Sequence, residues 1–361
     1  MFMTRILPGA FLLLLLTTAH VLPPSALADG KLMPPRDYKG SLEESSQEAI
    51  IIFQGSTKMG GAVEDLILKI TVHGEASTFG WVVPFPSEPR VTREDARIFK
   101  EVFDYVEARK ARSGKGKKGK LEAARGAESR PVVVLSRKVV GSYDVAVVRE
   151  KTRGTLNGWL GKEGFQTLPD GEEVIEFYRR KGYVFACMKV NDAGLRKDTP
   201  VDLHPLRFTF KTGGRDGIYF PMKMTGLQTA PFNVNLNVFY KAWLNDRLNR
   251  YGYVNRGFRL RFRDWDSTAC KPNRGKNYSA PETDPYLKPL AHRIPSVAKL
   301  FQKLHPGKRY YLTNIQARGL EPREVRDWSD DLWLFPYYTD PDVVPFDARP
   351  GEVAHTAWKQ D

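Results

Sequence analysis

Apolar and polar residues alternate with a period of two through most of the first two thirds of the chain. This alternation is typical of β-strands, because successive side chains of a strand point to opposite faces of the sheet. It predicts strands at residues 49–54, 66–72, 79–84, 132–140, 143–148, 183–190, 206–210, 218–224 and 234–240. So many short strands require a fold in which β-sheet forms the core.

Helical patterns are fewer and follow no regular order among the strands. The clearest is an apolar stripe at residues 93–109, with Thr92 as the expected N-cap. Shorter helices are predicted at residues 156–162, 172–181 and 297–304. Because strands and helices do not alternate regularly, we predict an α+β fold with a mixed, largely antiparallel β-sheet core, a few packed helices and a C-terminal extension.

The N-terminus has the features of a secretory signal peptide. Arg5 precedes an apolar segment, and Ala26-Leu27-Ala28 places small residues where a signal peptidase requires them. The apolar segment is short for a membrane anchor, which needs roughly 20 apolar residues. We therefore expect cleavage after Ala28 and a periplasmic or extracellular mature chain, in which no second apolar run is long enough for a transmembrane segment.

The two cysteines, Cys187 and Cys270, leave two interpretations open. In an exported chain they form a possible disulfide. Cys187, however, lies in an apolar alternating run where a buried free thiol is equally expected.

Basic charge is concentrated in two parts of the chain. The formal net charge is +14, and in residues 109–120 seven of twelve residues are basic. Residues 241–361 are Arg-rich, and the remainder of residues 29–240 carries no net charge. Repulsion and glycine content predict that residues 109–120 form a flexible, solvated loop.

An alternative hypothesis is that these basic residues bind a polyanion. An anionic envelope polymer is then the expected partner, and nucleic acid is not expected outside the cytoplasm. The arginines of residues 256–263 alternate with apolar residues, which favours an edge strand with a charged face. The candidate contacts are Lys115, Lys117, Lys118, Lys120, Arg259, Arg261 and Arg263.

Five sequence blocks together resemble a known family. They are residues 81–89 (WVVPFPSEP), 141–145 (GSYDV), 155–165 (TLNGWL with Gly164-Phe165), 183–190 (YVFACMKV) and 204–222 (HPLRFTF leading to YFPM). In this order and spacing they resemble the bacterial domain-of-unknown-function 2330 family over roughly residues 49–238. The resemblance implies an exported bacterial protein and no particular chemistry. Cysteines near the mature N-terminus and a terminal membrane segment, present in some relatives, are not found in this sequence.

The side chains in these blocks have both a packing and a ligand-binding interpretation. The prolines of residues 81–89 should end a strand, and Trp159 should pack a short helix against a sheet. Glu88 and Asp144 are the acidic groups that we would test first for acid/base catalysis. The candidate ligand-contacting residues are Trp81, Pro84, Pro86, Glu88, Tyr143, Asp144 and Trp159.

Strong catalytic and cofactor motifs were not found. Ser296-x-x-Lys299 and Lys211-Thr212-Gly213 occur in the wrong order for a penicillin-recognising serine enzyme. The spacing of the histidines and an imperfect calcium-loop pattern do not indicate a metal site. The sequence contains no glycine-rich phosphate loop, so we predict no cofactor. The acidic residues between Asp327 and Asp342 are interpreted as solvated surface.

These observations predict a signal peptide at residues 1–28, an α+β core at 29–240 and an Arg-rich region at 241–361, which would pack on the core or form a separate domain. The expected function is that of an exported, non-catalytic structural or binding protein. The alternatives are an envelope hydrolase acting on glycan or peptide, and a polyanion-binding module.

Overall fold

The computed structural model describes residues 26–27, 30–40, 42–57, 61–74, 76–110, 133–191, 201–213, 217–240, 259–263, 296, 299–300 and 311–334. Lys115, Lys117, Lys118, Lys120 and Cys270 lie outside these residues, as does most of the helix predicted at 297–304.

The larger sheet has nine strands. Its main path is β14-β15-β13-β3-β4-β11-β6, with β1 beside β13 and β10 beside β4. The pairs β13–β3 and β1–β13 are parallel and the others are antiparallel. The strands are β1 (Ala26–Leu27), β3 (Leu42–Thr57), β4 (Gly61–Gly74), β6 (Arg90–Arg93), β10 (Val201–Asp202), β11 (Leu206–Lys211), β13 (Phe232–Tyr240), β14 (Arg259–Arg263) and β15 (Tyr311–Leu320).

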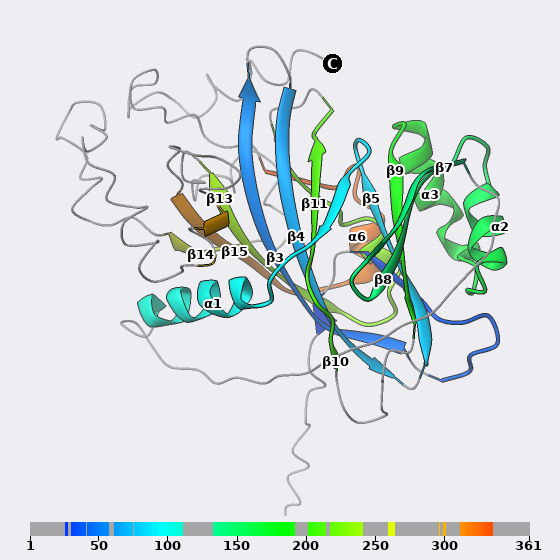
Figure 1. Ribbon diagram of the computed structural model, residues 1–361, viewed down its shortest axis with the longest axis horizontal. Coiled ribbons are helices and arrows are strands. Elements are labelled where there is room, and N and C mark those ends of the chain that lie inside the picture. Colours follow the sequence, from blue (N-terminus) through cyan, green and yellow to red (C-terminus); the bar gives the residue numbers. More distant parts are fainter. Residues whose placement is uncertain are drawn as a thin grey trace, which may run out of the picture.

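A five-stranded sheet lies beside it and is antiparallel throughout, in the order β2-β5-β9-β8-β7 (Figure 1). Its strands are β2 (Lys31–Met33), β5 (Thr78–Phe85), β7 (Val133–Val140), β8 (Tyr143–Arg149) and β9 (Val184–Asn191). A small antiparallel sheet joins β12 (Ile218–Phe220) to β16 (Leu332–Leu334). The prediction of an α+β fold with a mixed, largely antiparallel sheet core is confirmed.

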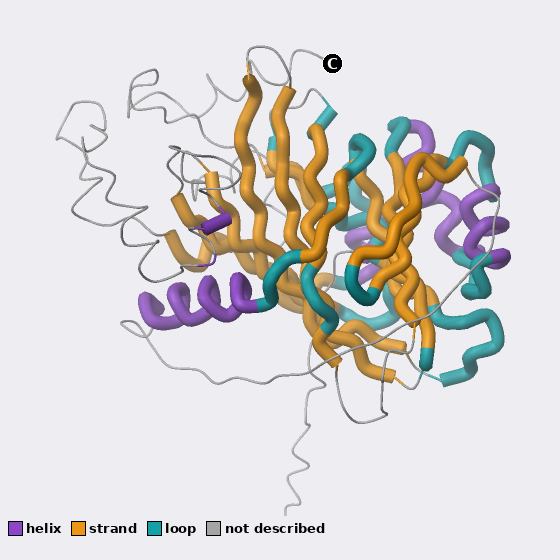
Figure 2. The backbone as a smooth tube through the Cα atoms, viewed as in Figure 1, coloured by secondary structure: helices purple, strands orange, loops and turns teal. Residues whose placement is uncertain are grey.

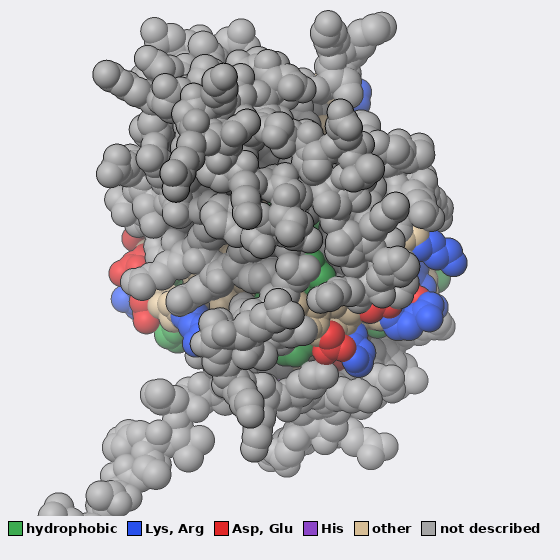
Figure 3. All heavy atoms as spheres, turned by 90° about the vertical axis from the view of Figure 1, so that its left-hand side faces the viewer, with side chains coloured by type: hydrophobic (Ala, Val, Ile, Leu, Met, Phe, Trp, Pro, Cys, Tyr) green, Lys and Arg blue, Asp and Glu red, His purple; other side chains and the backbone are tan. Residues whose placement is uncertain are grey.

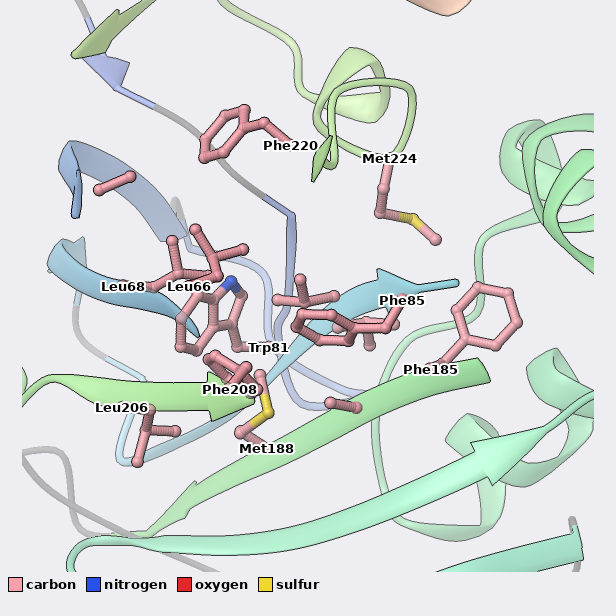
Figure 4. Close-up of a cluster of buried hydrophobic side chains, with 14 of the residues drawn as sticks. Leu66, Leu68, Trp81, Phe85, Phe185, Met188, Leu206, Phe208, Phe220 and Met224 are labelled. Atoms are coloured by element: carbon pink, nitrogen blue, oxygen red, sulfur yellow. The ribbon is translucent and has the colours of Figure 1, made fainter. Parts of the chain in front are cut away.

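Aromatic and aliphatic side chains from both large sheets form one core. Trp81 of β5 meets Phe208 of β11 edge-to-face, with ring centroids 6.2 Å apart, and Phe85 stacks on the same ring at 4.9 Å (Figure 4). Leu66 and Leu68 of β4 point toward this aromatic group. Burial of these large side chains is the main force that holds the two sheets together.

In space, the described helices lie at the sides of the sheets (Figures 1 and 2). They are α1 (Arg97–Lys110), α2 (Thr155–Lys162), α3 (Glu172–Arg180) and α6 (Pro322–Arg326), with 3₁₀ turns η1 (Pro169–Gly171) and η2 (Thr225–Leu227). In the part of the chain that the structure describes, no helix is both long and apolar enough to span a membrane.

Two local predictions were wrong. Helix α1 begins at Arg97, not at residue 93, because Thr92 belongs to strand β6 and Asp95 accepts the backbone N–H of Arg97 at 2.9 Å. The strand expected at residues 218–224 ends at Phe220, since Pro221 cannot donate to a β-ladder. Strand β14 does lie at the sheet edge among the described strands, as the arginine alternation indicated.

Surface charge is mixed where described residues can be seen in the view of Figure 3. Lysine and arginine side chains lie next to aspartate and glutamate side chains in the band of described residues that this view leaves visible.

Candidate functional site: an ion-pair cluster beneath helix α2

Four of the five family-like blocks come together at the side of the five-stranded sheet that helix α2 covers, and the block at residues 204–222 does not contribute. Small residues on three adjacent strands, Gly80, Ala146 and Cys187, leave a hollow in this face of the sheet. Helix α2 covers the hollow with Trp159 and Leu160. The other lining residues are Trp81, Val82, Arg137, Asp144, Glu163, Phe165, Met188 and Lys189.

Four charged side chains of the hollow form what we call the α2 ion-pair cluster: Arg137, Asp144, Glu163 and Lys189. The guanidinium of Arg137 donates to Asp144 at 2.5 Å and approaches Glu163 at 3.3 Å. The ammonium of Lys189 lies 3.9 Å from Glu163 Oε2. Two positive and two negative groups cancel, so burial of the cluster carries no net charge.

Lys189 also binds the C-terminal end of helix α2. Lys189 Nζ donates to the main-chain oxygen of Glu163 at 2.9 Å, and Glu163 is the C-cap of α2. A cation at this end satisfies an otherwise unused helix carbonyl and interacts favourably with the helix dipole. Lys189 also lies over the Phe165 ring, 5.2 Å from its centroid. The cluster therefore ties α2 and the turn after it to β7, β8 and β9.

Geometry and chemistry both oppose catalysis in the hollow. The cavity volume is about 10 Å³, roughly the space for one water molecule and far less than a sugar ring needs. Burial, with a smaller contribution from Glu163, raises the pKa of the Cys187 thiol well above its usual value. A reduced Cys187 is consequently a poor nucleophile.

The candidate residues divide into two groups. Trp81, Asp144 and Trp159 line the hollow, together with the buried Cys187. Glu88 is exposed and lies after the end of β5, outside this hollow. The two acidic residues proposed for acid/base work are thus not brought together at this site.

The remaining block residues take part in packing and hydrogen bonding between elements. Tyr143 is buried and donates through its hydroxyl to the main-chain oxygen of His204 at 3.1 Å. The main-chain oxygen of Pro84 accepts the hydroxyl of Tyr219 at 3.1 Å. Pro86 is half-buried just beyond β5.

Basic candidates in the C-terminal region are located only by their backbone. Arg259, Arg261 and Arg263 belong to β14, whose side chains are outside the described part of the structure. A disulfide between Cys187 and Cys270 stays a prediction, because Cys270 is not described.

A second buried polar group, which we call the Asp331 cluster, surrounds Asp331, the residue directly before β16. Asp331 accepts the hydroxyls of Tyr178 and Tyr219 at 2.8 and 3.0 Å, and the backbone N–H groups of Met222 and Lys223, both at 2.9 Å. Burial raises the pKa of Asp331 in spite of these donors. The interpretation of Asp331 as solvated surface was wrong. Among the described residues no group of His, Cys, Asp and Glu side chains could hold a metal ion.

Sequence reasoning missed Arg137, Glu163 and Lys189. Lys189 could have been noticed, because a lysine inside the apolar run of residues 183–190 requires a buried partner. Glu163 has no such local signal, since it lies 26 residues from both Arg137 and Lys189. Arg137 lies seven residues from Asp144 in the β7–β8 hairpin, and this short separation is the one signal that could have indicated it.

The fold and the cluster define a class of protein: a two-sheet α+β protein whose characteristic sequence blocks build a packed, charge-compensated junction. Residues 48–328 match the family described as "Uncharacterized protein conserved in bacteria (DUF2330)", and the chain belongs to this family. The match includes β14, β15 and α6, well beyond residue 238, where the resemblance was expected to end.

Comparison with other known proteins adds little. No curated protein matches the sequence. Among solved structures, the chain is similar to the crystal structure of baculovirus P35, with 10% sequence identity and a TM-score of 0.34 over 62% of this chain and 73% of that chain. A TM-score this low does not indicate a shared fold.

Proposed function

We propose that this chain is an exported bacterial protein that acts outside the cytoplasm as a non-catalytic structural or binding protein of the envelope. One observation carries the non-catalytic part. The family-block side chains that meet beneath α2 are packed or ion-paired with one another, and the space left among them suits about one water molecule. A hydrolase acting on a glycan or peptide needs an open cleft with an available acid or base.

Export is supported by the N-terminal sequence and is compatible with the contacts near it. Cleavage after Ala28 would remove β1, which pairs with β13 only at Ala26 and Leu27. The contacts that follow would persist: the N–H of Gly30 donates to Thr225 Oγ1 at 2.9 Å, and β2 pairs with β5. The mature chain would therefore keep its attachment to the core.

The export proposal is tested by expressing the full chain in a bacterium and fractionating the cells. Intact mass and N-terminal sequencing should find a periplasmic or secreted chain that starts at Asp29. A matched variant, Ala28→Arg, should block processing, because signal peptidase requires a small residue at this position. A full-length chain confined to the cytoplasm would overturn the proposal.

The non-catalytic proposal is tested by incubating the mature chain with purified cell wall and with unstructured peptides. No soluble fragments should be released above the level of a buffer control. Release that is lost in Asp144→Asn or Glu88→Gln, with the variants still folded, would establish the hydrolase alternative. Pull-down from an envelope fraction would then identify a ligand for the binding role, with unfolded chain as the control.

The polyanion alternative has its own measurement. Binding to an anionic wall polymer should weaken steeply as salt is raised if lysines and arginines make the contacts. Deletion of residues 109–120 should then weaken binding and reduce its salt dependence. Binding unchanged by the deletion would exclude a role for this loop.

A further inference from the structure

His204 connects the two large sheets at the point where the β7–β8 hairpin turns. It precedes β11 of the larger sheet by two residues, and the turn at Gly141 and Ser142 belongs to the five-stranded sheet. The two segments come from the family-like blocks 141–145 and 204–222, and the second of these is the block that does not reach the α2 hollow. This junction is therefore a second place where family-like blocks meet.

Three consecutive residues of the hairpin contact His204. The backbone N–H of Ser142 donates to Nε2 at 2.8 Å. The hydroxyl of Tyr143 donates to the main-chain oxygen of His204 at 3.1 Å, and the two rings pack edge-to-face with their centroids 4.8 Å apart. Gly141, with φ +58°, approaches the ring so closely that a Cβ would lie 2.1 Å from Nε2. The imidazole is thus held between the backbone of the turn and the Tyr143 ring.

The neighbours of the two ring nitrogens determine where the imidazole carries its proton. A backbone N–H can only donate, so Nε2, which accepts the N–H of Ser142, has a lone pair and no proton. On the other side Nδ1 lies 3.3 Å from the main-chain oxygen of Pro205, which can only accept. Both contacts require a neutral His204 with its proton on Nδ1.

Protonation of Nε2 would remove the contact with the turn. An imidazolium carries a proton on both nitrogens and has no acceptor, so its Nε2–H would point at the N–H of Ser142. The hydrogen bond is then lost, and two donors face each other in a part-buried place. Because Gly141 and Tyr143 confine the ring, the turn has to move away from it. The closed contact and a protonated His204 therefore exclude each other.

The charged groups around the junction do not favour an imidazolium. Tyr143, the titratable group packed on the ring, is neutral at acid and neutral pH. Arg93, which pairs in register with Leu206, adds positive charge on the side of β6. The carboxylates on the surrounding segments are each paired with a basic side chain: Asp144 with Arg137, Asp202 with Lys69, and Glu94 with Arg207.

We propose that His204 and the β7–β8 turn form a pH-sensitive latch between the two large sheets. The latch is closed when the imidazole is neutral and opens when it is protonated. An unconstrained histidine gains its second proton near pH 6.5, so opening is expected as the pH falls below about 6. Because only the open latch binds this proton, the ratio of open to closed chains rises by up to about tenfold for each pH unit. This inference is independent of whether the protein is exported or binds a ligand.

The test is amide hydrogen exchange at Ser142 in the folded chain, followed by NMR from about pH 7.5 to 4.5. The protection factor, which corrects for the intrinsic pH dependence of exchange, should be constant above pH 7 and fall up to about tenfold per pH unit below about 6. The amides of β9, the central strand of the same sheet, should stay protected. Constant protection at Ser142, or a parallel loss at β9 that indicates global unfolding, would overturn the latch. A ring ¹⁵N spectrum at pH 7.5 that places the His204 proton on Nε2 would also overturn it.

Two variants separate the hydrogen bond from its titration. His204→Gln keeps a side-chain acceptor that does not titrate, so Ser142 should stay protected without the pH dependence. His204→Ala removes the acceptor, and protection should be low at every pH. His73→Gln, which replaces a half-buried histidine of β4, is the matched control and should behave like the wild type. Wild-type pH dependence in His204→Gln, or its loss in His73→Gln, would contradict the proposal, and the wild-type measurements decide it even where a variant does not fold.

Discussion

The hydroxyl of Tyr219 lies 3.0 Å from Oδ2 of Asp331, and both residues are completely buried. Tyr219 ties the small β12–β16 sheet to both large sheets. Its hydroxyl proton is shared between Asp331 and the main-chain oxygen of Pro84 of β5, 3.1 Å away, and its backbone N–H donates to Glu64 of β4 at 2.8 Å. One side chain therefore links elements that are far apart in the sequence.

Removing the acceptor at the centre of this cluster should be strongly destabilising. Asp331→Ala leaves the Tyr178 hydroxyl and two backbone N–H groups without their acceptor, while the Tyr219 hydroxyl keeps Pro84. Each unsatisfied buried group costs about 1–3 kcal/mol. We expect the free energy of unfolding, measured by urea denaturation, to fall by more than about 3 kcal/mol. Tyr219→Phe should cost about 1 kcal/mol.

The matched control for this prediction is Asp327→Ala, an exposed aspartate in the same segment. Its unfolding free energy should stay close to that of the wild type. If Asp331→Ala and Asp327→Ala were equally stable, the hydrogen bonds of Asp331 would contribute nothing measurable.

Glu64 makes the stability of the fold depend on pH in an unusual direction. Burial raises the pKa of this carboxyl well above its usual value. Between the usual and the raised pKa the folded chain holds a proton that the unfolded chain has released, so rising pH favours unfolding. Glu64→Gln should therefore increase the unfolding free energy at pH 7 and remove a slope of at most about 1.4 kcal/mol per pH unit.

Glu176 provides the comparison of opposite sign. Hydrogen bonds from Arg179 and Arg180 lower its pKa to about 2. Its contribution is present at neutral pH and is lost as the pH falls from about 4.5 toward 2. Urea denaturation of Glu176→Gln across pH 2–8 should differ from the wild type in pH dependence only at the acid end, and Glu64→Gln only above the usual carboxyl range. Two variants with the same pH profile would contradict these assignments.

The α2 ion-pair cluster should be costly to break and less costly to remove as a pair. Lys189→Met leaves the buried Glu163 with Arg137 as its remaining cation, and breaking a buried pair costs about 3–5 kcal/mol. The double variant Lys189→Met with Glu163→Gln should be more stable than Lys189→Met alone. Thermal and urea unfolding of the four members of the cycle measure the coupling.

Lys138→Met is the control for this cycle, because Lys138 is an exposed lysine on strand β7 of the same sheet. We expect its unfolding free energy to change by less than about 0.5 kcal/mol. A double variant less stable than both singles would show that the cluster is not organised around the Lys189–Glu163 contact.

The sequence predicted the parts of the fold that depend on local pattern. Period-two alternation located nearly all the central strands, because their apolar faces are buried between the sheets. It missed residues 42–48, the first part of β3 (Leu42–Thr57). These residues are mostly polar, and they are in a strand because they pair with β4. It also missed β6 (Arg90–Arg93). This short strand lies between the proline-containing residues 84–89 and α1, and it pairs with β11 far along the chain.

The candidate site was predictable only in part. Trp81, Asp144 and Trp159 were selected because they lie in the family-like blocks, and these three do meet at one hollow. Of the other charged members of the cluster, Arg137 lies seven residues before Asp144 in the β7–β8 hairpin. Glu163 and Lys189 come from other segments and are selected by tertiary packing, which no local pattern encodes. The same holds for Asp331, whose acidic neighbours suggested a solvated surface although its own side chain is fully buried.

A turn glycine offers the sharpest test of contact between the two large sheets. Gly141, in the turn between β7 and β8, has φ +58°, and a Cβ built there would lie 2.1 Å from His204 Nε2. The ring of His204 cannot move away freely, because Nε2 accepts the N–H of Ser142 at 2.8 Å and the ring packs edge-to-face on Tyr143 at 4.8 Å.

Gly141→Ala should therefore carry two costs, and Gly164→Ala only one. Gly164 has φ +88° and no atom within 4 Å of a built Cβ, so its substitution costs about 1–2 kcal/mol of backbone strain alone. Gly141→Ala adds overpacking against His204, about 1–3 kcal/mol more. Adding His204→Ala to each variant separates the two costs: it should recover part of the loss at Gly141 and none at Gly164. Equal unfolding free energies for the two glycine variants would mean that the turn and His204 are not in contact.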